Sequence, residues 1–440
     1  MYKQYKAKNS KDNILSKIDI LGSFDFTTCL IALDSIEDKD MKKLSNTELQ
    51  SAESNLNYRK VLPLAIHEYT HFIDSTSTVW GINHLTMMND AYLSNDKINK
   101  DEKLFYKTKI FYNHLAKIKY PKYYNVINSD SKEHKPWVAY PTIGILFNSD
   151  GQITDESIIF LRFSSLEMEE IARSPISAVS ILEASAMAQE IVSEIGILTK
   201  LNKEDLAMEN ILYTKKLMSI IYDKELTEYS ACVHMLANQQ QCKDILQSFL
   251  LVSIITRVVL NCTEDIFTKI ITNNQLTNIF NIPETESIIK RLQDGLKYQN
   301  IGVLYYIIVF GLPEKSYLTE KTAIEGLKQS LKKLGITIDD IQSSATNYIE
   351  NKITKLEQSS LSSITQIAKA SKENFNKISI TSSELIFHEL NLPKVFLGDC
   401  TEILIFKNEN NSLSEFNLDK CFNELAEGSS WVNRFSEACI

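Results

Sequence analysis

Glycine and proline are scarce throughout this chain, with 12 glycines and 8 prolines among 440 residues. Both residues interrupt helices and favour tight turns, so their scarcity predicts long helices joined by few turns. A chain of this length is expected to form two or three domains. Hydrophobic residues make up 44% of the chain and charged residues 23%, a balance typical of globular proteins that excludes a mostly disordered chain.

Acidic residues outnumber basic residues, 56 to 47, for a formal net charge of −9. The chain has no long basic run, so we expect it to bind neither nucleic acid nor the surface of a membrane. Its two most apolar runs, 248–260 and 301–312, are shorter than the roughly 18 residues that a transmembrane helix needs. Both runs therefore predict buried core helices.

The N-terminal sequence, MYKQYKAKNSKDN, is polar and lacks the apolar core of a secretory signal. The seven cysteines are odd in number and widely spaced, and no CxxC occurs among them. This pattern favours reduced thiols over disulfides or a cysteine-bound metal. We therefore expect a cytoplasmic protein.

The first half of the chain mixes strand and helix patterns. Apolar, β-branched and aromatic residues at 17–34 predict one or two strands, and the polar segment 35–58 predicts a loop with a short helix. Proline is tolerated in the first turn of a helix, so the apolar stretch after Pro63 predicts a helix over 62–76. Two strand-like runs, at 137–147 and 153–163, flank the turn sequence Asn-Ser-Asp-Gly and predict a hairpin.

The second half is expected to be mainly helical. Ser174 as N-cap and Pro175 at the first helical position predict a helix that reaches about Lys200. Apolar residues at helical spacing predict helices throughout 203–380, and the segment FHELNLPKVFLGDCTEILIF after them predicts one strand. The expected fold class is α+β and predominantly α-helical, with a large helical C-terminal region.

One short motif carries recognisable chemistry: His67-Glu68-Tyr69-Thr70-His71, an HExxH sequence. On a helix, residues i and i+4 lie on one face, so both imidazoles can bind one Zn²⁺. Glu68 lies next to the first ligand and can accept a proton from a zinc-activated water that attacks a carbonyl. These are the roles of the HExxH metallopeptidase motif.

The surroundings of the motif strengthen this interpretation. The residues on either side of it are largely apolar, which predicts a buried helix, and burying two histidines and a glutamate without a partner is costly. His388-Glu389 begins in the same way, but Leu392 occupies the position of the second histidine. That second sequence is therefore an ordinary pair.

A catalytic zinc usually has three protein ligands and one open position. Asp74 and Ser77 stand where a metzincin has glycine and histidine, which argues against that class. Asp74 is too far along the helix to bind the ion together with His67, and it is expected instead to accept a hydrogen bond from a histidine. Glu183 lies in an apolar, small-residue helix and is the preferred third ligand, with Glu190 as the alternative.

The segments HEYTHFID and ILEASAMAQE together resemble the gluzincin branch of the zincin metallopeptidases, in which a glutamate of an ExxA-type sequence completes the metal site. The resemblance implies a zincin-like core over residues 1–202: a small sheet, the HExxH helix and a second ligand helix. It implies His67, His71 and Glu183 as zinc ligands and Glu68 as the general base.

The family also uses a hydrogen-bond donor to stabilise the oxyanion. By residue type the candidates are Tyr69, His84, His114, His134 and Tyr140, and nothing in their spacing selects one. In zincins an edge strand commonly pairs with an extended substrate. The hairpin within 137–163 is the expected source of that strand.

These observations predict a zinc-dependent endopeptidase that acts on proteins or peptides. A cytoplasmic protease must be restrained, so we expect a selective enzyme or one regulated by a protein partner. The mainly helical segment 203–440 is expected to bind the substrate or that partner. The alternative is a catalytically inactive zincin-like module that serves protein interaction.

Overall fold

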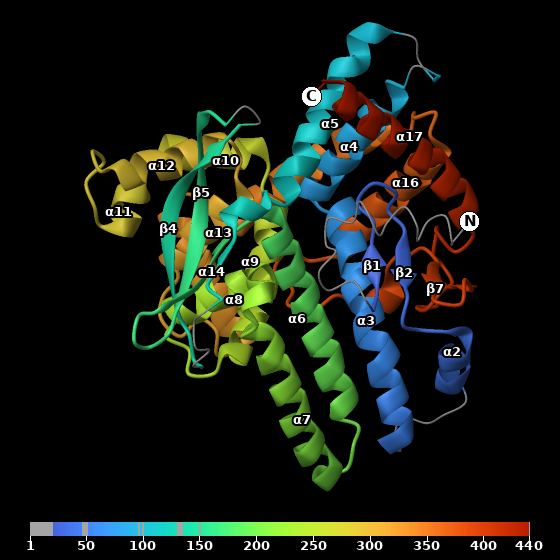
Figure 1. The fold of residues 1–440 in the computed structure, drawn as a ribbon, viewed down its shortest axis with the longest axis horizontal. Helices are drawn as coiled ribbons and strands as arrows, with labels where there is room; N and C mark the ends of the chain where they lie inside the picture. The colour runs from blue at the N-terminus through green and yellow to red at the C-terminus, as the bar shows by residue number, and fades with distance from the viewer. Residues whose placement is uncertain are drawn as a thin grey trace.

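The computed structural model shows a chain of many helices and two small sheets, which confirms the predicted α+β class with a helical majority (Figure 1). The structure describes residues 21–45, 52–95, 97–98, 101–129, 135–148 and 151–439. The predicted strand region 17–34 therefore lies partly outside the described residues, as does part of the turn between the two hairpin strands.

The first sheet joins the beginning of the chain to a segment near its end. Its order is β1-β2-β7-β8, formed by Ser23–Phe24, Ile31–Leu33, Val395–Leu397 and Glu402–Ile403. β1 is an edge strand and pairs antiparallel with β2, whereas β2 and β7 are parallel. The C-terminal region therefore supplies two strands where its sequence predicts one.

The second sheet is antiparallel throughout, in the order β3-β6-β5-β4. Its strands are Val126–Ile127, Glu170–Pro175, Ile153–Ser164 and Val138–Phe147. The predicted hairpin of β4 and β5 is confirmed, and Gly151 in its turn has a positive φ of 73°, a conformation that glycine adopts without strain. β6 is a strand that the sequence prediction lacked.

β6 also corrects the predicted start of the next helix. Pro175 ends this strand, and helix α6 runs over Ala178–Leu198 with Ser177 as its N-cap. The side chains of Ser177 and Ser180 form a reciprocal capping box, which satisfies backbone N–H groups that the first helical turn leaves unpaired. The pairing of β6 with β5 therefore outweighs the local preference of Pro175 for a helix start.

The helix that carries the HExxH motif is longer than predicted. α3 runs over Ala52–Thr76, and Pro63 lies inside it instead of opening it. Tertiary contacts hold the extra turns: the Asn55 amide donates to the carbonyl of Ile197 over 2.9 Å, and Arg59 forms an ion pair with Glu194 over 2.6 Å. The segment 35–58 contains the expected short helix, α2 (Asp38–Ser45).

Among the described residues, the remaining α-helices include those that confirm the helical prediction for 203–380, two that precede β3 and one near the C-terminus. They are α4 (Val79–Leu93), α5 (Phe105–Ile118), α7 (Lys203–Ile221), α8 (Thr227–Gln239), α9 (Phe249–Leu260), α10 (Glu264–Asn273), α11 (Leu276–Phe280), α12 (Ser287–Lys297), α13 (Ile301–Gly311), α14 (Glu320–Lys333), α15 (Ile338–Leu356), α16 (Ser362–Lys377) and α17 (Leu418–Cys439). Short 3₁₀ helices lie at Glu102–Leu104, Lys122–Tyr124, Lys224–Leu226, Ile245–Ser248 and Phe387–Glu389.

α3 and α6 lie side by side near the middle of the molecule (Figure 1). The hairpin and α8 to α14 lie on the α6 side, and α4, α5, α16, α17 and the first sheet lie on the α3 side. One continuous cluster of buried apolar side chains extends from Phe24 to Val432. Residues from both predicted regions, 1–202 and 203–440, therefore share one core.

The two apolar runs noted in the sequence form α9 and α13, which are largely buried. Within the described ranges, no single helix is both long and apolar enough to cross a membrane. One pair, Ile245–Leu260 with Glu264–Asn273, passes the same test only when the two helices are joined across a bend of 100°. The six cysteines whose side chains are described are free thiols.

Candidate metal centre

α3 places the two motif histidines one turn apart on the face that meets α6. Their Nε2 atoms lie 3.2 Å from each other. Their rings are close to perpendicular, with centroids 4.9 Å apart. The His71 side chain is 1% exposed and that of His67 is 15% exposed. The i, i+4 spacing therefore brings the two ring nitrogens together, as the sequence predicts.

Glu183 of α6 faces both histidines. One of its carboxylate oxygens lies 3.3 Å from Nε2 of His67, and the other lies 3.4 Å from Nε2 of His71. Two ligand atoms held about 2.1 Å from one tetrahedral ion are about 3.4 Å apart. The distance between the two imidazole nitrogens, and the distance from each nitrogen to its nearer carboxylate oxygen, are close to this value. The three predicted ligands therefore form a group that could hold a metal ion.

Burial and mutual attraction set the protonation of this group. Burial by itself raises the pKa of Glu183, but the two imidazoles more than reverse this and lower that pKa to about 2. Burial lowers the pKa of His71, which favours the neutral ring that binds metals. Burial opposes the charge on His67 as well, but the carboxylates of Glu183 and Glu190 raise its pKa well above the usual value.

Glu190, the alternative third ligand, lies on the other side of the His67 ring. Its carboxylate is 3.0 Å from Nδ1 of His67, whereas Nε2 faces Glu183. A carboxylate that accepts the Nδ1 hydrogen holds the imidazole in the tautomer that leaves Nε2 available to a metal. Glu190 lies about two turns beyond Glu183 on α6. Its carboxylate is therefore placed to orient the His67 ring.

Asp74 does not have the partner that the sequence predicts. Its buried side chain faces Ser185 of α6 and Arg257 of α9 instead of a histidine. Burial raises the pKa of Asp74 to about 6. Asp74 lies seven positions after His67, two turns along α3 and beyond the metal-binding group. It therefore joins a separate buried cluster between three helices.

Glu68 faces a small cavity beside the metal-binding group. The cavity has a volume of about 130 Å³, and His67, Glu183 and Glu190 also line it. Gly22, next to β1, lies against the Glu68 carboxylate: a Cβ at this position would be 3.0 Å from Oε1. The wall contributed by α3, α6, α7 and α8 is mainly apolar but includes one lysine: Leu64, Met187, Leu217, Ile220, Tyr213, Tyr229 and Lys216.

The cavity wall revises two expectations about the substrate side of the site. Its strand-side residues are Leu21 and Gly22, next to edge strand β1, and among the described residues the hairpin of β4 and β5 contributes none. The residues before β1, and not the predicted hairpin, therefore border this cavity. Strand β1 approaches Glu68 because it packs against α3, a contact between segments about 40 residues apart that no local pattern reveals.

None of the five predicted oxyanion donors lines this cavity in the described part of the chain. The Tyr69 hydroxyl donates to the carbonyl of Pro393 over 2.7 Å, and His84 bonds to the carbonyl of Phe26 and to His114. Tyr140 lies on β4, and His134 lies outside the described residues.

The hydroxyl-bearing side chains that do line the cavity are Tyr213 of α7 and Tyr229 of α8. Both are buried. Burial raises the pKa of the Tyr213 hydroxyl, so this group remains a donor. Sequence reasoning missed both tyrosines because each is unremarkable in its own helix and reaches the site only through the packing of α7 and α8 against α6.

Comparison with known proteins gave no match to a family model, to a curated protein or to a solved structure. The resemblance to gluzincins therefore rests on the two sequence segments and on the geometry that brings them together.

Proposed function

We propose that this protein is a zinc-dependent endopeptidase built on a zincin-like core. The observation that carries the proposal is the arrangement of His67, His71 and Glu183, in which one ligand atom from each residue lies within 4.8 Å of the other two. Two imidazoles and one carboxylate are a common ligand set of catalytic zinc, which keeps its fourth position open. Glu68, on the same helix, faces the adjoining cavity.

In this proposal each residue of the site has a separate role in metal binding or catalysis. His67, His71 and Glu183 would hold the ion, and Glu190 would keep the His67 ring in place. A bound zinc ion would lower the pKa of water and polarise the carbonyl of the scissile peptide bond. Glu68 would accept the proton of the attacking water and deliver it to the leaving amine. Tyr213 and Tyr229 would donate hydrogen bonds to the carbonyl oxygen as it gains charge.

The cavity beside Glu68 supports a selective enzyme. At about 130 Å³ it has room for one side chain of moderate size, and most of its wall is apolar. Apolar groups bind in such a space by leaving water. A protein or peptide with an aliphatic residue next to the scissile bond is the substrate class that fits. Restraint by a protein partner remains part of this proposal.

The experiment is a comparison of peptide cleavage by wild type, Glu68→Gln and Glu389→Gln, each with its zinc content measured by mass spectrometry. A peptide library is the substrate, and cleaved bonds are identified by sequencing. Removing a general base costs about 10² to 10⁴ in rate, so Glu68→Gln should be nearly inactive while retaining zinc. Glu389 belongs to the sequence His388-Glu389, which lacks the second histidine, so its variant should match wild type.

Two outcomes would contradict the proposal. If Glu68→Gln cleaves as fast as wild type, the cleavage does not use the proposed site. If wild type holds one zinc per chain and cleaves nothing in the library, the protein is a zincin-like interaction module without turnover.

A further inference from the structure

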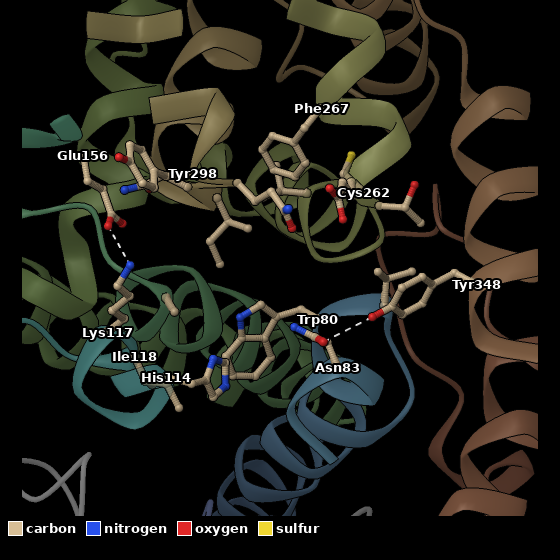
Figure 2. A pocket seen from close by; sticks show the side chains of 18 of the residues that line it. Trp80, Asn83, His114, Lys117, Ile118, Glu156, Cys262, Phe267, Tyr298 and Tyr348 are labelled. Carbon is tan, nitrogen blue, oxygen red and sulfur yellow. Dashed lines mark hydrogen bonds and ion pairs between the residues drawn. The ribbon is translucent and has the colours of Figure 1, made fainter. Parts of the chain in front are cut away.

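A second and larger cavity lies beside α4 and α5 (Figure 2). Its volume is about 460 Å³, within the range of small-molecule binding sites. α4, α5, β5, α10 and α15 all contribute to its wall, and it shares no lining residue with the cavity beside Glu68. This cavity is therefore separate from the metal centre.

Aromatic rings lie on opposite sides of this second cavity. Figure 2 shows Trp80 on one side and Phe267 on the other, with Tyr298 and Tyr348 at the ends. The Trp80 ring is held in place from behind: it stacks on His84 at 10° with centroids 5.8 Å apart. Two fixed aromatic faces with open space between them suit a flat ring system, which gains affinity by stacking.

Polar groups mark the two ends of the same space. At one end Lys117 and Glu156 form an ion pair over 2.6 Å, and the Glu156 side chain is 8% exposed. At the other end the Tyr348 hydroxyl donates to the Asn83 carbonyl oxygen over 3.2 Å. This leaves the Asn83 amide nitrogen on the cavity side, as Figure 2 shows, with two hydrogens to donate.

The charges of the cavity favour an uncharged ligand. Lys117 pairs with Glu156, and Lys352 and Glu264 add one charge of each sign to the lining, so its formal charges balance. A ligand with a net charge would be attracted by two of these side chains and repelled by the other two. A neutral heterocycle can instead hydrogen-bond to the atoms of the pair that remain free.

We propose that this cavity binds a neutral purine, as the free base or as a nucleoside. A purine offers a flat face to Trp80 and Phe267, and the Asn83 amide nitrogen can donate to an acceptor nitrogen of the purine ring. A carboxylate such as that of Glu156 accepts a hydrogen bond from an exocyclic amine. The proposal does not depend on peptidase activity, because the two cavities have no residue in common.

The test is a calorimetric titration of the full chain with adenosine, and in parallel with adenine, guanosine, uridine and free tryptophan. Wild type should bind a purine saturably with one site per chain. Loss of base stacking weakens binding by at least about fivefold, so Trp80→Leu should bind at least that much more weakly. Asn83→Ala should weaken binding by about fivefold through the loss of a hydrogen bond.

Trp431→Phe is the matched control, because Trp431 packs against Phe105 and lies outside the cavity. It should bind like wild type. Tyr348→Phe is a milder cavity variant that keeps the aromatic ring, so it tests the site even if Trp80→Leu does not fold. Circular dichroism establishes which variants fold.

Several results would overturn the proposal. The first is the absence of saturable binding of any purine to wild type at millimolar concentration. The second is binding of tryptophan or uridine in preference to purines, which would assign the cavity to another ligand class. The third is purine binding that neither Trp80→Leu, Asn83→Ala nor Tyr348→Phe weakens, which would place the ligand elsewhere.

Discussion

The two cavities of this protein are built on consecutive helices but are organised for different tasks. The cavity beside Glu68 is small and mainly apolar, and His67 and Glu183 in its wall lie within hydrogen-bond distance of each other. The cavity beside Trp80 is more than three times larger and has its polar groups at opposite ends. Convergent polar groups suit chemistry on one bond, whereas separated polar groups around aromatic faces suit recognition of a whole molecule.

The metal-binding group and the cavity beside Trp80 are connected by the junction of α3 and α4. α3 ends at Thr76, and α4 begins at Val79 after the N-cap Thr78. Gly81 permits this sharp junction, because a Cβ there would lie 2.5 Å from the carbonyl oxygen of Asp74. The metal-binding group and the cavity beside Trp80 are therefore joined by a short connection. Variants at one site must be used to test whether the other site is affected.

The largest expected effect is the loss of zinc from a variant of a proposed metal ligand, compared with a variant of the second cavity. Glu183→Ala removes one of three proposed ligands and should lower zinc affinity more than about 100-fold, beyond the effect of losing an outer partner. Zinc content after dialysis should fall from about one per chain to background by mass spectrometry. Asn83→Ala, in the second cavity, should retain full zinc content. Zinc retained in Glu183→Ala would place the third ligand elsewhere.

A smaller effect on zinc affinity distinguishes a ligand from a residue that orients a ligand. Glu190→Ala removes the carboxylate that lies 3.0 Å from His67 Nδ1, and loss of such a partner typically costs about 10- to 100-fold in metal affinity. Competition with a chromophoric chelator measures this change. Glu209→Ala is the control, since Glu209 bonds to Arg59 and not to a histidine. Equal affinities in both variants would remove the orienting role of Glu190.

The pH dependence of stability tests the region between the cavities. Burial lowers the pKa of His84 from its usual 6.5 to about 4. Between these pH values the unfolded chain binds a proton that the folded chain does not, so His84 contributes stability above pH 6.5 that is lost as the pH falls toward 4. From pH 8 to pH 5 the loss is about 2 kcal/mol.

Urea unfolding of wild type and His84→Gln at several pH values measures this contribution. The free energy of unfolding of His84→Gln should fall less steeply between pH 8 and pH 5, by about 2 kcal/mol. His388→Gln replaces an exposed histidine and should keep the wild-type pH dependence. Parallel curves for wild type and His84→Gln would show that His84 is not the group responsible.

The smallest expected effect is a change in kcat when Gly22, which lies next to β1 and against Glu68, is replaced. Gly22→Ala puts a methyl group against the Glu68 carboxylate and should displace it, lowering kcat by about tenfold with zinc content unchanged. Gly196→Ala adds the same methyl group where no atom lies within 4 Å, so its kcat should match wild type. Equal kcat values for both variants would mean that Gly22 does not position Glu68.

Local sequence patterns predicted the parts of the site that lie within single helices. The i, i+4 spacing of His67 and His71 places both rings on one face of any helix, whatever surrounds it. The apolar setting of Glu183 marked it as a buried carboxylate that needs partners, and the structure supplies two imidazoles. The hairpin was predictable for the same reason, because its turn residues and alternating strands are local signals.

The sequence prediction was wrong where local preference met a tertiary contact. Pro175 favours the start of a helix, but strand pairing holds it at the end of β6. Pro63 should open α3, but Asn55 and Arg59 anchor an earlier stretch of that helix to its neighbours. Each of these contacts joins residues far apart in the chain, so no window of sequence contains both partners.

The sequence by itself determined the helical character of the chain and the identities of His67, Glu68, His71 and Glu183, because scarce helix breakers and helical spacing act over a few residues. Only the tertiary structure decided that Glu183 faces both histidines, that Glu190 lies at Nδ1 of His67, and that Gly22, Tyr213 and Tyr229 line the same cavity as Glu68. Only the tertiary structure formed the cavity beside Trp80. A cavity is the space left where distant elements pack, and its shape depends on all of them at once.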